Sequence, residues 1–432
     1  MNSPLPTTLA QDHSRELMHS LDTHGCLDYE GKMCISTAPL FIPAGGQMFG
    51  VLVCQDPEGH EVVLKAFSGQ YQGNWLIDGW VPPVCDIARF NTIVKQSDKE
   101  IHILTDILGS ASKEEAAAIQ KKRGDLSRES LKKLYELYLF RCIDGSDICL
   151  SSIFGDELPP TGTGDCCAPK LLNHAFKNGL RPISMSEFYY GDTNRSKTKE
   201  HRQFYGPCDQ RCEPLLKHML GLDIIYCDEC LIVVNKASGM LSVPGRFVKD
   251  CAEARVKDLF PDTIKQPAVH RLDMDTSGLI VYALTKEVHR NLSIQFIKKE
   301  VHKEYIAVVE GVIKENSGII ELPFRLDVDH RPYQIYDPQQ GKMGITRWKK
   351  VQVDYLQKDR LVTRIHFTPE TGRTHQLRVH SAHELGLGHP IVGDRLYGRK
   401  EEGQRLLLHA ALLSFNHPVS GERMMFTCDP EF

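Results

Sequence analysis

Short apolar runs separated by turn residues fill the second half of the chain. Residues 223–245 read "DIIYCDECLIVVNKASGMLSVPG", which predicts a strand, a tight turn, a second strand and a loop rich in Gly and Pro. Apolar runs at 304–313 and 361–372 predict further strands, whereas 286–303 and 373–387 show the helical period. Without any internal repeat, this mixture predicts an α+β domain with a mixed, mostly antiparallel sheet.

The first half also predicts a mixed α/β structure. Two β-branched runs at 48–69 flank Asp-Pro-Glu-Gly, which is typical of a hairpin. Residues 112–140 carry helix formers throughout, and Gly124 predicts a break into two helices. Residues 156–180 predict a turn-rich entry to a short helix that ends at Gly179.

Residues 189–214 are polar and rich in turn formers, with no clear period. A segment of this kind is typical of a linker between domains. We therefore expect an N-terminal extension over 1–213 and a second domain over 214–432.

The composition is that of a soluble globular protein, with 41% hydrophobic and 25% charged residues among 432. No run reaches the roughly 18 apolar residues that a membrane helix needs. The N-terminus lacks a basic segment followed by an apolar one, so no secretory signal is predicted. Fourteen cysteines are too few for a disulfide scaffold of this length. We expect a cytoplasmic protein with mostly reduced thiols and no membrane partner.

The net charge of −4 hides an uneven distribution. Residues 221–432 hold 29 Lys and Arg against 28 Asp and Glu, and the remaining residues hold 23 against 28. Within 341–378 nine basic residues stand against three acidic ones. Such a concentration could line a groove for a polyanion, although a solvated charged face explains it equally well.

The stretch "HRLDMDTSGL", residues 270–279, places acidic and basic side chains on a turn directly before an apolar run. An Arg–Asp pair on a loop is by itself usually structural. Here it is followed in order by "KEYIAVVEG" (303–311), "TGRTHQLRVH" (371–380) and "LGHPIVGDRLYG" (387–398). Together these four segments resemble the RluA-type pseudouridine synthases over about 220–432. The sister RsuA type fits less well, because its members usually carry Gly where His270 stands.

The resemblance implies a pseudouridine synthase fold with a central RNA-binding cleft. It implies an isomerase that breaks the uracil–ribose C–N bond, rotates the base and rejoins it through a ring carbon, without a cofactor. Asp273 matches the family's catalytic aspartate, and Arg378 matches the arginine that pairs with it. Tyr305 matches the aromatic residue that lies against the uracil ring and takes the proton released from the rejoining carbon.

The target base must leave the RNA stack to reach such a pocket. Arg271 matches a family arginine that fills the vacated space, and we expect His270, Arg373 and His375 to contact RNA as well. Lys236 and His270 are expected to brace the cleft. The expected substrate is a stem-loop of large-subunit ribosomal RNA or of transfer RNA, acted on by a monomer. Which RNA and which uridine stay open.

Four cysteines of the first half, in "DCCAPK" (165–170) and "PCDQRC" (207–212), have spacings found in zinc sites. They are Cys166, Cys167, Cys208 and Cys212. The pattern resembles cytidine-deaminase-like folds, in which one ligand opens a helix and two more follow a proline. The glutamate that those enzymes carry two residues after the first ligand is missing, and buried reduced thiols are the alternative.

Other readings of the sequence remain open. His375, His380 and His383 have helical spacing that suggests a metal face, but the resemblance assigns no metal there, so RNA or structural contacts are expected. The chain could be a catalytically silent RNA-binding protein, against which the presence of Asp273, Tyr305 and Arg378 counts. It could also be a two-activity enzyme with a deaminase-like first half.

Overall fold

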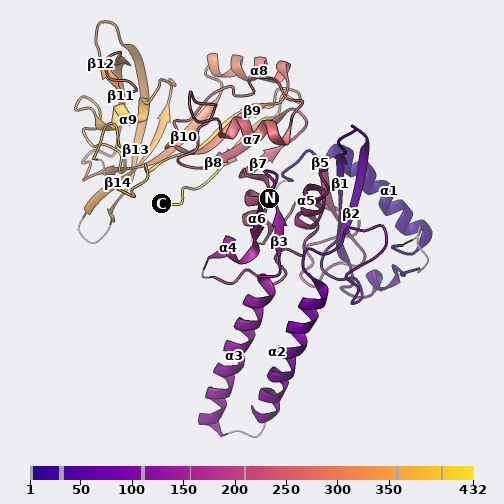
Figure 1. Ribbon diagram of the computed structural model, residues 1–432. Coiled ribbons are helices and arrows are strands. Elements are labelled where there is room, and N and C mark those ends of the chain that lie inside the picture. The colour runs from indigo at the N-terminus through magenta and orange to yellow at the C-terminus, as the bar shows by residue number, and fades with distance from the viewer. Residues whose placement is uncertain are drawn as a thin grey trace. The chain divides into compact units, whose positions relative to one another are not determined.

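A computed structural model describes residues 3–28, 34–108, 112–155, 157–208, 211–356, 360–399 and 402–432. The chain divides into two compact units, Met1–Gly221 and Leu222–Phe432 (Figure 1). The division lies after the expected domain start at 214, because α6 (Cys212–Leu220) packs on α4 (Leu150–Phe154) and α5 (Cys167–Lys177) of the first unit. In the described part of the chain, no helix is long and apolar enough to cross a membrane.

The first unit is built on a four-stranded sheet in the order β2-β1-β5-β6. The predicted hairpin is present as β1 (Gln47–Gln55) and β2 (Glu61–Phe67), and β5 (Arg181–Tyr190) pairs antiparallel with β1. Helix α1 (Thr8–His24) and helix α5 cover opposite faces of the sheet. Phe49 of β1 packs in the core under α1, whereas Gly50 faces Cys167 and Leu171 of α5.

Two long helices run side by side in the first unit (Figure 1). They are α2 (Ile87–Leu108) and α3 (Lys113–Tyr135). The predicted break at Gly124 was wrong, because α3 runs through this residue and nothing lies within 4 Å of where its Cβ would be. A capping box between Ser112 and Glu115 fixes the start of the helix. The smaller elements are η1 (Ala38–Phe41), β3 (Leu139–Arg141) and β4 (Asp147–Cys149).

The segment 189–214 is folded onto the first unit, so its prediction as a linker was wrong. Strand β6 (Phe204–Tyr205) pairs with β5, and the Asn194 side chain accepts hydrogen bonds from the backbone N–H of Thr198 and Lys199. The polar residues therefore stabilise local turns through side chain–backbone bonds, where composition alone indicated a mobile connection.

The second unit is built on a ten-stranded sheet in the order β12-β11-β13-β14-β10-β15-β9-β8-β7, with β16 paired to β15. Among the strand pairs of the described residues, only β9 and β15 run parallel. The predicted mixed, mostly antiparallel sheet is confirmed. Its strands are β7 (Ile224–Cys227), β8 (Leu231–Lys236), β9 (Ser277–Ala283), β10 (His302–Glu310), β11 (Ser317–Leu326), β12 (Gln334–Tyr336), β13 (Lys342–Leu356), β14 (Arg360–Pro369), β15 (Leu408–Asn416) and β16 (Arg423–Thr427).

The described residues of this unit form three helices beside the sheet: α7 (Ala252–Leu259), α8 (Lys286–Ile297) and α9 (Gln376–Ala382). Helices α8 and α9 are shorter than 286–303 and 373–387, the ranges that the sequence predicts. Side chains of α8 pack with β8, β9 and β15 in one core, and those of α9 pack with β10, β11, β13 and β14 in another. Strand β15 contributes Leu413 and Phe415 to the first core and Leu408 to the second, and the candidate site opens beside β15 and its neighbour β10.

Candidate active site

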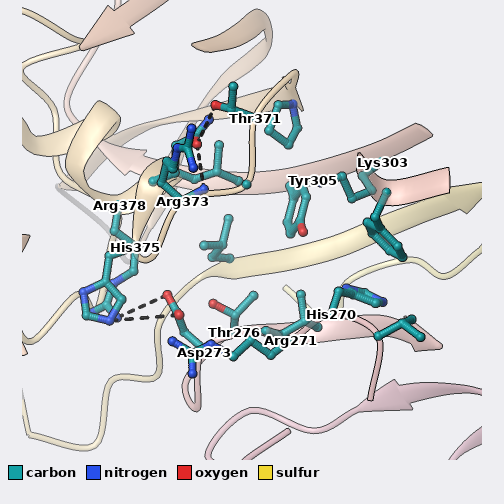
Figure 2. A pocket seen from close by; sticks show the side chains of 18 residues that line it. His270, Arg271, Asp273, Thr276, Lys303, Tyr305, Thr371, Arg373, His375 and Arg378 are labelled. Atoms are coloured by element: carbon teal, nitrogen blue, oxygen red, sulfur yellow. Dashed lines mark hydrogen bonds and ion pairs between the residues drawn. The ribbon is translucent and has the colours of Figure 1, made fainter. Parts of the chain in front are cut away.

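A cleft of about 350 Å³ opens between the loop before β9, strand β10 and the loop that leads into α9 (Figure 2). Its volume lies within the roughly 300–1,000 Å³ that is usual for ligand sites. All seven residues that the sequence suggested for catalysis or RNA contact line this cleft: Arg271, Asp273, His270, Tyr305, Arg373, His375 and Arg378. The structure thus brings together side chains that are up to about a hundred residues apart in the chain.

The loop that carries Asp273 is held from both sides. The backbone N–H of Thr276 donates to the carbonyl of Asp273 at 3.1 Å, and the Ser242 hydroxyl bonds both the N–H and the carbonyl of Leu272. Gly278 has a φ of 114°, and a Cβ there would stand 2.4 Å from the carbonyl oxygen of Ala410. Only glycine allows this close approach, which lets β9 pair with β15 directly behind the loop.

Lys236 braces the same loop from below. Its buried ammonium group donates to the carbonyls of Ala237, Met240 and Met274 at 2.7–3.0 Å. Burial lowers the pKa of this group to about 8, although the charges of Asp273 and Asp275 oppose the shift. The three carbonyls take up the three donors of the ammonium, so Lys236 fixes the loop and does not reach the cleft.

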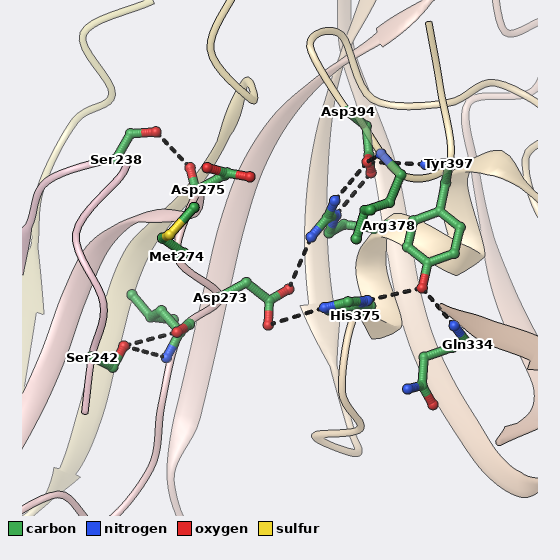
Figure 3. A network of polar contacts seen from close by, with 12 residues as sticks. Ser238, Ser242, Asp273, Met274, Asp275, Gln334, His375, Arg378, Asp394 and Tyr397 are labelled. Carbon is green, nitrogen blue, oxygen red and sulfur yellow. Dashed lines mark hydrogen bonds and ion pairs between the residues drawn. The ribbon is translucent and has the colours of Figure 1, made fainter. Parts of the chain in front are cut away.

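Asp273 points at two cationic or polar groups across the cleft (Figure 3). Its Oδ2 lies 3.7 Å from Nη1 of Arg378, and its Oδ1 lies 4.0 Å from Nε2 of His375. The Asp273 side chain is 24% exposed, whereas that of Arg378 is 3% exposed. A carboxylate placed in this way remains open to a ligand while it is held near a buried positive charge.

Arg378 is oriented by a residue that the sequence analysis did not single out. Its Nε and Nη2 donate to the two carboxylate oxygens of Asp394 at 2.8 and 2.6 Å, and Asp394 is fully buried. Asp394 lies in "LGHPIVGDRLYG", where an acidic residue follows an apolar run. Asp394 is the one acidic residue of this motif, and that was the available signal.

His375 completes the polar network shown in Figure 3. Its backbone is in the left-handed region, with a φ of 56°, and this turns the side chain toward Asp273 just before α9 begins. Nδ1 lies 2.8 Å from the hydroxyl of Tyr397, which itself accepts from the Gln334 N–H. A hydroxyl that donates to Nδ1 leaves the ring proton on Nε2, which faces Asp273. Burial lowers the pKa of His375, which favours the neutral ring.

Tyr305 lies on β10 with its ring at the cleft (Figure 2). Burial and the negative charge of Asp273 raise the pKa of its phenol. The hydroxyl is therefore protonated at neutral pH, and it enters the site as a phenol that can pass on a proton.

His270 is a neutral support on the opposite side of the cleft. Burial and the nearby charge of Lys303 lower its pKa to about 3, and its Nε2 accepts a hydrogen bond from the Val281 N–H at 3.2 Å. The ring packs against Phe296 with centroids 4.7 Å apart. His270 thus anchors the loop to β9 while one side of the ring faces the cleft.

Positive charge surrounds the mouth of the cleft. Arg271 and Arg373 are exposed, and Lys303 lines both this cleft and an adjoining hollow that also includes Lys299. Sequence reasoning missed Lys303 as a site residue, although it precedes Tyr305 by two positions and so points to the same face of β10. Such a rim suits a polyanion, whose binding releases counterions.

The histidines of α9 do not converge on one point. His380 is fully buried and its ring meets that of Phe324 edge-on, with centroids 5.7 Å apart. His383 packs against Tyr336. Within the described residues, none of His375, His380 and His383 belongs to a group of three or more potential metal ligands. The cysteines of the first unit do form such a group, which consists of Cys166, Cys208 and Cys212 without Cys167.

Comparisons with known proteins place the second unit among RNA-modifying enzymes. A family model described as RNA pseudouridylate synthase matches residues 230–383. The chain is 44% identical over 216 residues to the dual-specificity RNA pseudouridine synthase RluA of Haemophilus influenzae, and 43% identical over 216 residues to that of Escherichia coli. Each match covers 49% of this chain and 94% of the relative. The solved structure of human RNA pseudouridylate synthase domain containing 1 is 29% identical, covers 49% of this chain and 84% of that one, and has a TM-score of 0.41.

Proposed function

Because this chain belongs to the RluA family of pseudouridine synthases, which are intramolecular isomerases, we propose that it converts particular uridines in structured RNA to pseudouridine by means of Asp273. Ribosomal and transfer RNA are the proposed substrates, and the relatives' description as dual-specificity enzymes supports more than one RNA target. The first 220 or so residues lie outside the matched region.

The observation that carries the proposal is the position of Asp273 at the floor of a cationic cleft, within 3.7 Å of a buried guanidinium. A carboxylate can act as a nucleophile or base, and the Arg378 guanidinium lies close enough to orient it. Because Asp394 already satisfies two donors of Arg378, the guanidinium cannot swing away from the site when RNA is absent.

The reaction is an isomerisation, so its atoms balance within the nucleotide. The bond between N1 of uracil and the ribose is broken, and a bond from C5 to the same ribose carbon is formed. The proton of C5 is released and N1 gains one. Asp273 is suited to the first part of this sequence, and the Tyr305 phenol is suited to relay the proton, because both side chains face the same cleft.

Recognition of the RNA requires the target base to leave its stack. Arg271 is exposed at the cleft mouth and directly precedes the loop segment that carries Asp273. A planar guanidinium there can stack on the bases that the flipped uridine leaves behind. Arg373 and Lys303 lie on the opposite side of the cleft, where they can meet phosphates next to the target.

The proposal is tested with RNA labelled with tritium at C5 of uridine, because every conversion releases that tritium to water. The full-length protein should release tritium from total ribosomal or transfer RNA, and mapping of pseudouridines with and without the protein should locate the sites. RNA binding without any release from either substrate would instead identify a catalytically silent RNA-binding protein and overturn the proposal.

A further inference from the structure

Three cysteine sulfurs of the first unit lie close together although they come from distant parts of the chain. The Sγ of Cys208 lies 4.0 Å from that of Cys166 and 3.4 Å from that of Cys212. All three sulfurs lie within 4.8 Å of one another. Cys166 precedes Cys208 by 42 residues, so tertiary folding alone brings the three thiols to one point.

These spacings fit a single tetrahedral metal ion. Three thiolates bound to zinc at about 2.3 Å are separated by about 3.8 Å from one another. A disulfide instead requires its sulfurs to stand about 2.05 Å apart. In an iron–sulfur cluster, at least two of any three cysteine ligands bind different iron atoms, which keeps those thiolates farther apart.

The backbone around the cluster favours thiolates. Cys166 is the N-cap of α5 and Cys212 is the first residue of α6, so two packed helices begin at the three sulfurs. Helix N-termini carry partial positive charge, which favours anionic ligands. Cys208 is exposed, Cys166 is half-buried and Cys212 is buried, so an ion can reach the cluster from solvent and is then held by a buried ligand.

Cys167 does not belong to the cluster, which corrects the set of four that the sequence suggested. Its Sγ points to the carbonyls of Met48 and Ala66, at 3.5 and 3.7 Å, in the core between α5 and the sheet. Gly50 makes room for it, since a Cβ at that position would stand 2.6 Å from the Cβ of Cys167. Successive residues at the start of a helix point about 100° apart. The Cys166 side chain therefore lies in the cluster, whereas the Cys167 side chain lies in the core.

A buried carboxylate supports the first turn of α5 beside the cluster. Glu187 on β5 is 6% exposed, and its Oε1 accepts from the N–H of Ala168 at 2.8 Å. Ala168 stands two residues after Cys166, at the position where deaminase-like zinc proteins carry an acid. Glu187 is therefore a positioning residue, which holds the helix start that presents Cys166.

The second unit holds another group of potential metal ligands, which consists of Asp228, Cys230 and His417. This group differs from the cysteine cluster because its carboxylate already has hydrogen-bond partners within the protein. The Asp228 carboxylate accepts hydrogen bonds from two backbone N–H groups, from Tyr226 and from His417. Its lone pairs are therefore used within the fold, and the group is explained as a hydrogen-bonded turn.

We propose that Cys166, Cys208 and Cys212 bind one zinc ion as thiolates and thereby fix the start of α6 to the start of α5. Zinc displaces three thiol protons to solvent as three sulfur–zinc bonds form, with no change of oxidation state. The fourth coordination position belongs to a ligand other than these three thiolates. The three cysteines belong to the first unit and the isomerase cleft to the second, so the proposal requires no part of the proposed function.

Metal analysis of the full-length protein, purified under reducing conditions, tests the proposal. We expect about one zinc per chain in the wild type and a loss of most of it in Cys208→Ser, which changes an exposed side chain. Cys149→Ser is a control, because Cys149 is a half-buried helix N-cap like Cys166 but lies outside the cluster. This control and Cys230→Ser should both retain zinc.

Cobalt substitution gives a readout that does not depend on the folding of a variant. Wild-type protein reconstituted with Co²⁺ should show thiolate-to-cobalt charge transfer and the intense visible bands of tetrahedral coordination. Removal of the metal by a chelator should lower the Tm of the full-length protein, and zinc should restore it. A well-folded wild type that contains no metal, takes up no cobalt, or has Cys208 and Cys212 joined in a disulfide would overturn the proposal. Zinc that is lost from Cys230→Ser but kept in Cys208→Ser would overturn it as well.

Discussion

Arg378 and Asp394 form a buried two-point ion pair, with contacts of 2.8 and 2.6 Å, and Asp273 meets the same guanidinium only at 3.7 Å. Arg378 thus forms hydrogen bonds with the buried carboxylate of Asp394 and a longer ionic contact with the carboxylate of Asp273. Because Asp394 holds it from behind, Arg378 keeps its place while Asp273 stays 24% exposed and able to react.

We expect Asp273→Asn to abolish tritium release while folding and RNA binding are kept. The amide has nearly the same shape as the carboxylate but is neither a nucleophile nor a base of useful strength. Asp275→Asn, two residues further along the same loop, is the matched control and should stay near the wild-type rate. Substantial turnover by a pure Asp273→Asn protein would sink the assignment of Asp273.

Arg378→Ala should destabilise the protein by on the order of 3–5 kcal/mol, because it removes the cationic partner of the fully buried Asp394 and leaves its charge only the backbone N–H groups of Leu396 and Tyr397. The measurement is denaturant unfolding followed by a probe in the second unit. The double variant Arg378→Met with Asp394→Asn should recover part of this stability, because the amide oxygen can still accept from the N–H groups of Leu396 and Tyr397. It should recover no activity, since Asp273 then lacks its cationic neighbour. Wild-type turnover in Arg378→Ala would show that Asp273 depends on another partner.

Tyr305→Phe should bind RNA with nearly the wild-type affinity, because the ring face is kept, and should lose turnover by 10-fold or more. Since burial and Asp273 raise the pKa of Tyr305, its phenol stays protonated through neutral pH and the wild-type rate should not rise with phenolate formation between pH 7 and 9. Single-turnover tritium release across this range provides the measurement. A rate that climbs with pH in the wild type but not in Tyr305→Phe would show that the phenolate is the active form.

Acid should weaken the fold through His270. Its pKa in the folded protein is about 3, whereas an exposed histidine has a pKa of about 6.5. As the pH falls below about 6.5, the unfolded chain binds a proton that the folded chain does not, so this residue lowers the free energy of unfolding by up to about 2 kcal/mol at pH 5. His270→Gln should remove that part of the pH dependence. Equal slopes for the two proteins between pH 7 and 5 would contradict the prediction.

A fragment that begins at Leu222 should fold and keep some isomerase activity. It contains every cleft residue, the cores that pack against α8 and α9, and the region that the relatives share. We expect altered choice of sites, because the first unit carries a net charge of about −5 and is poorly suited to add general affinity for RNA. The comparison is pseudouridine mapping for the fragment and the full chain. A folded fragment that is inert on every substrate of the full chain would show that the first unit helps to shape the cleft.

The sequence by itself predicted the mixed sheet through local patterns, and it predicted the candidate residues of the cleft through the resemblance of its motifs to a known family. Alternating apolar runs predict strands, and the four ordered motifs carry Asp273, Tyr305 and Arg378 at fixed positions. The predictions for Gly124 and for the segment 189–214 were wrong. Helix propensity and polarity describe the preference of a residue in isolation, and they do not tell which helix contains the residue or which hydrogen bonds it forms in the folded protein.

Only the tertiary structure decided which carboxylate binds Arg378 most closely, and which of two adjacent cysteines faces a possible metal. Asp394 contacts Arg378 across a sequence separation of 16 residues, and Cys166 contacts Cys208 across a separation of 42. Such contacts depend on how helices and strands pack, and the pattern of a sequence fixes the faces of its elements but not the partner that each face meets.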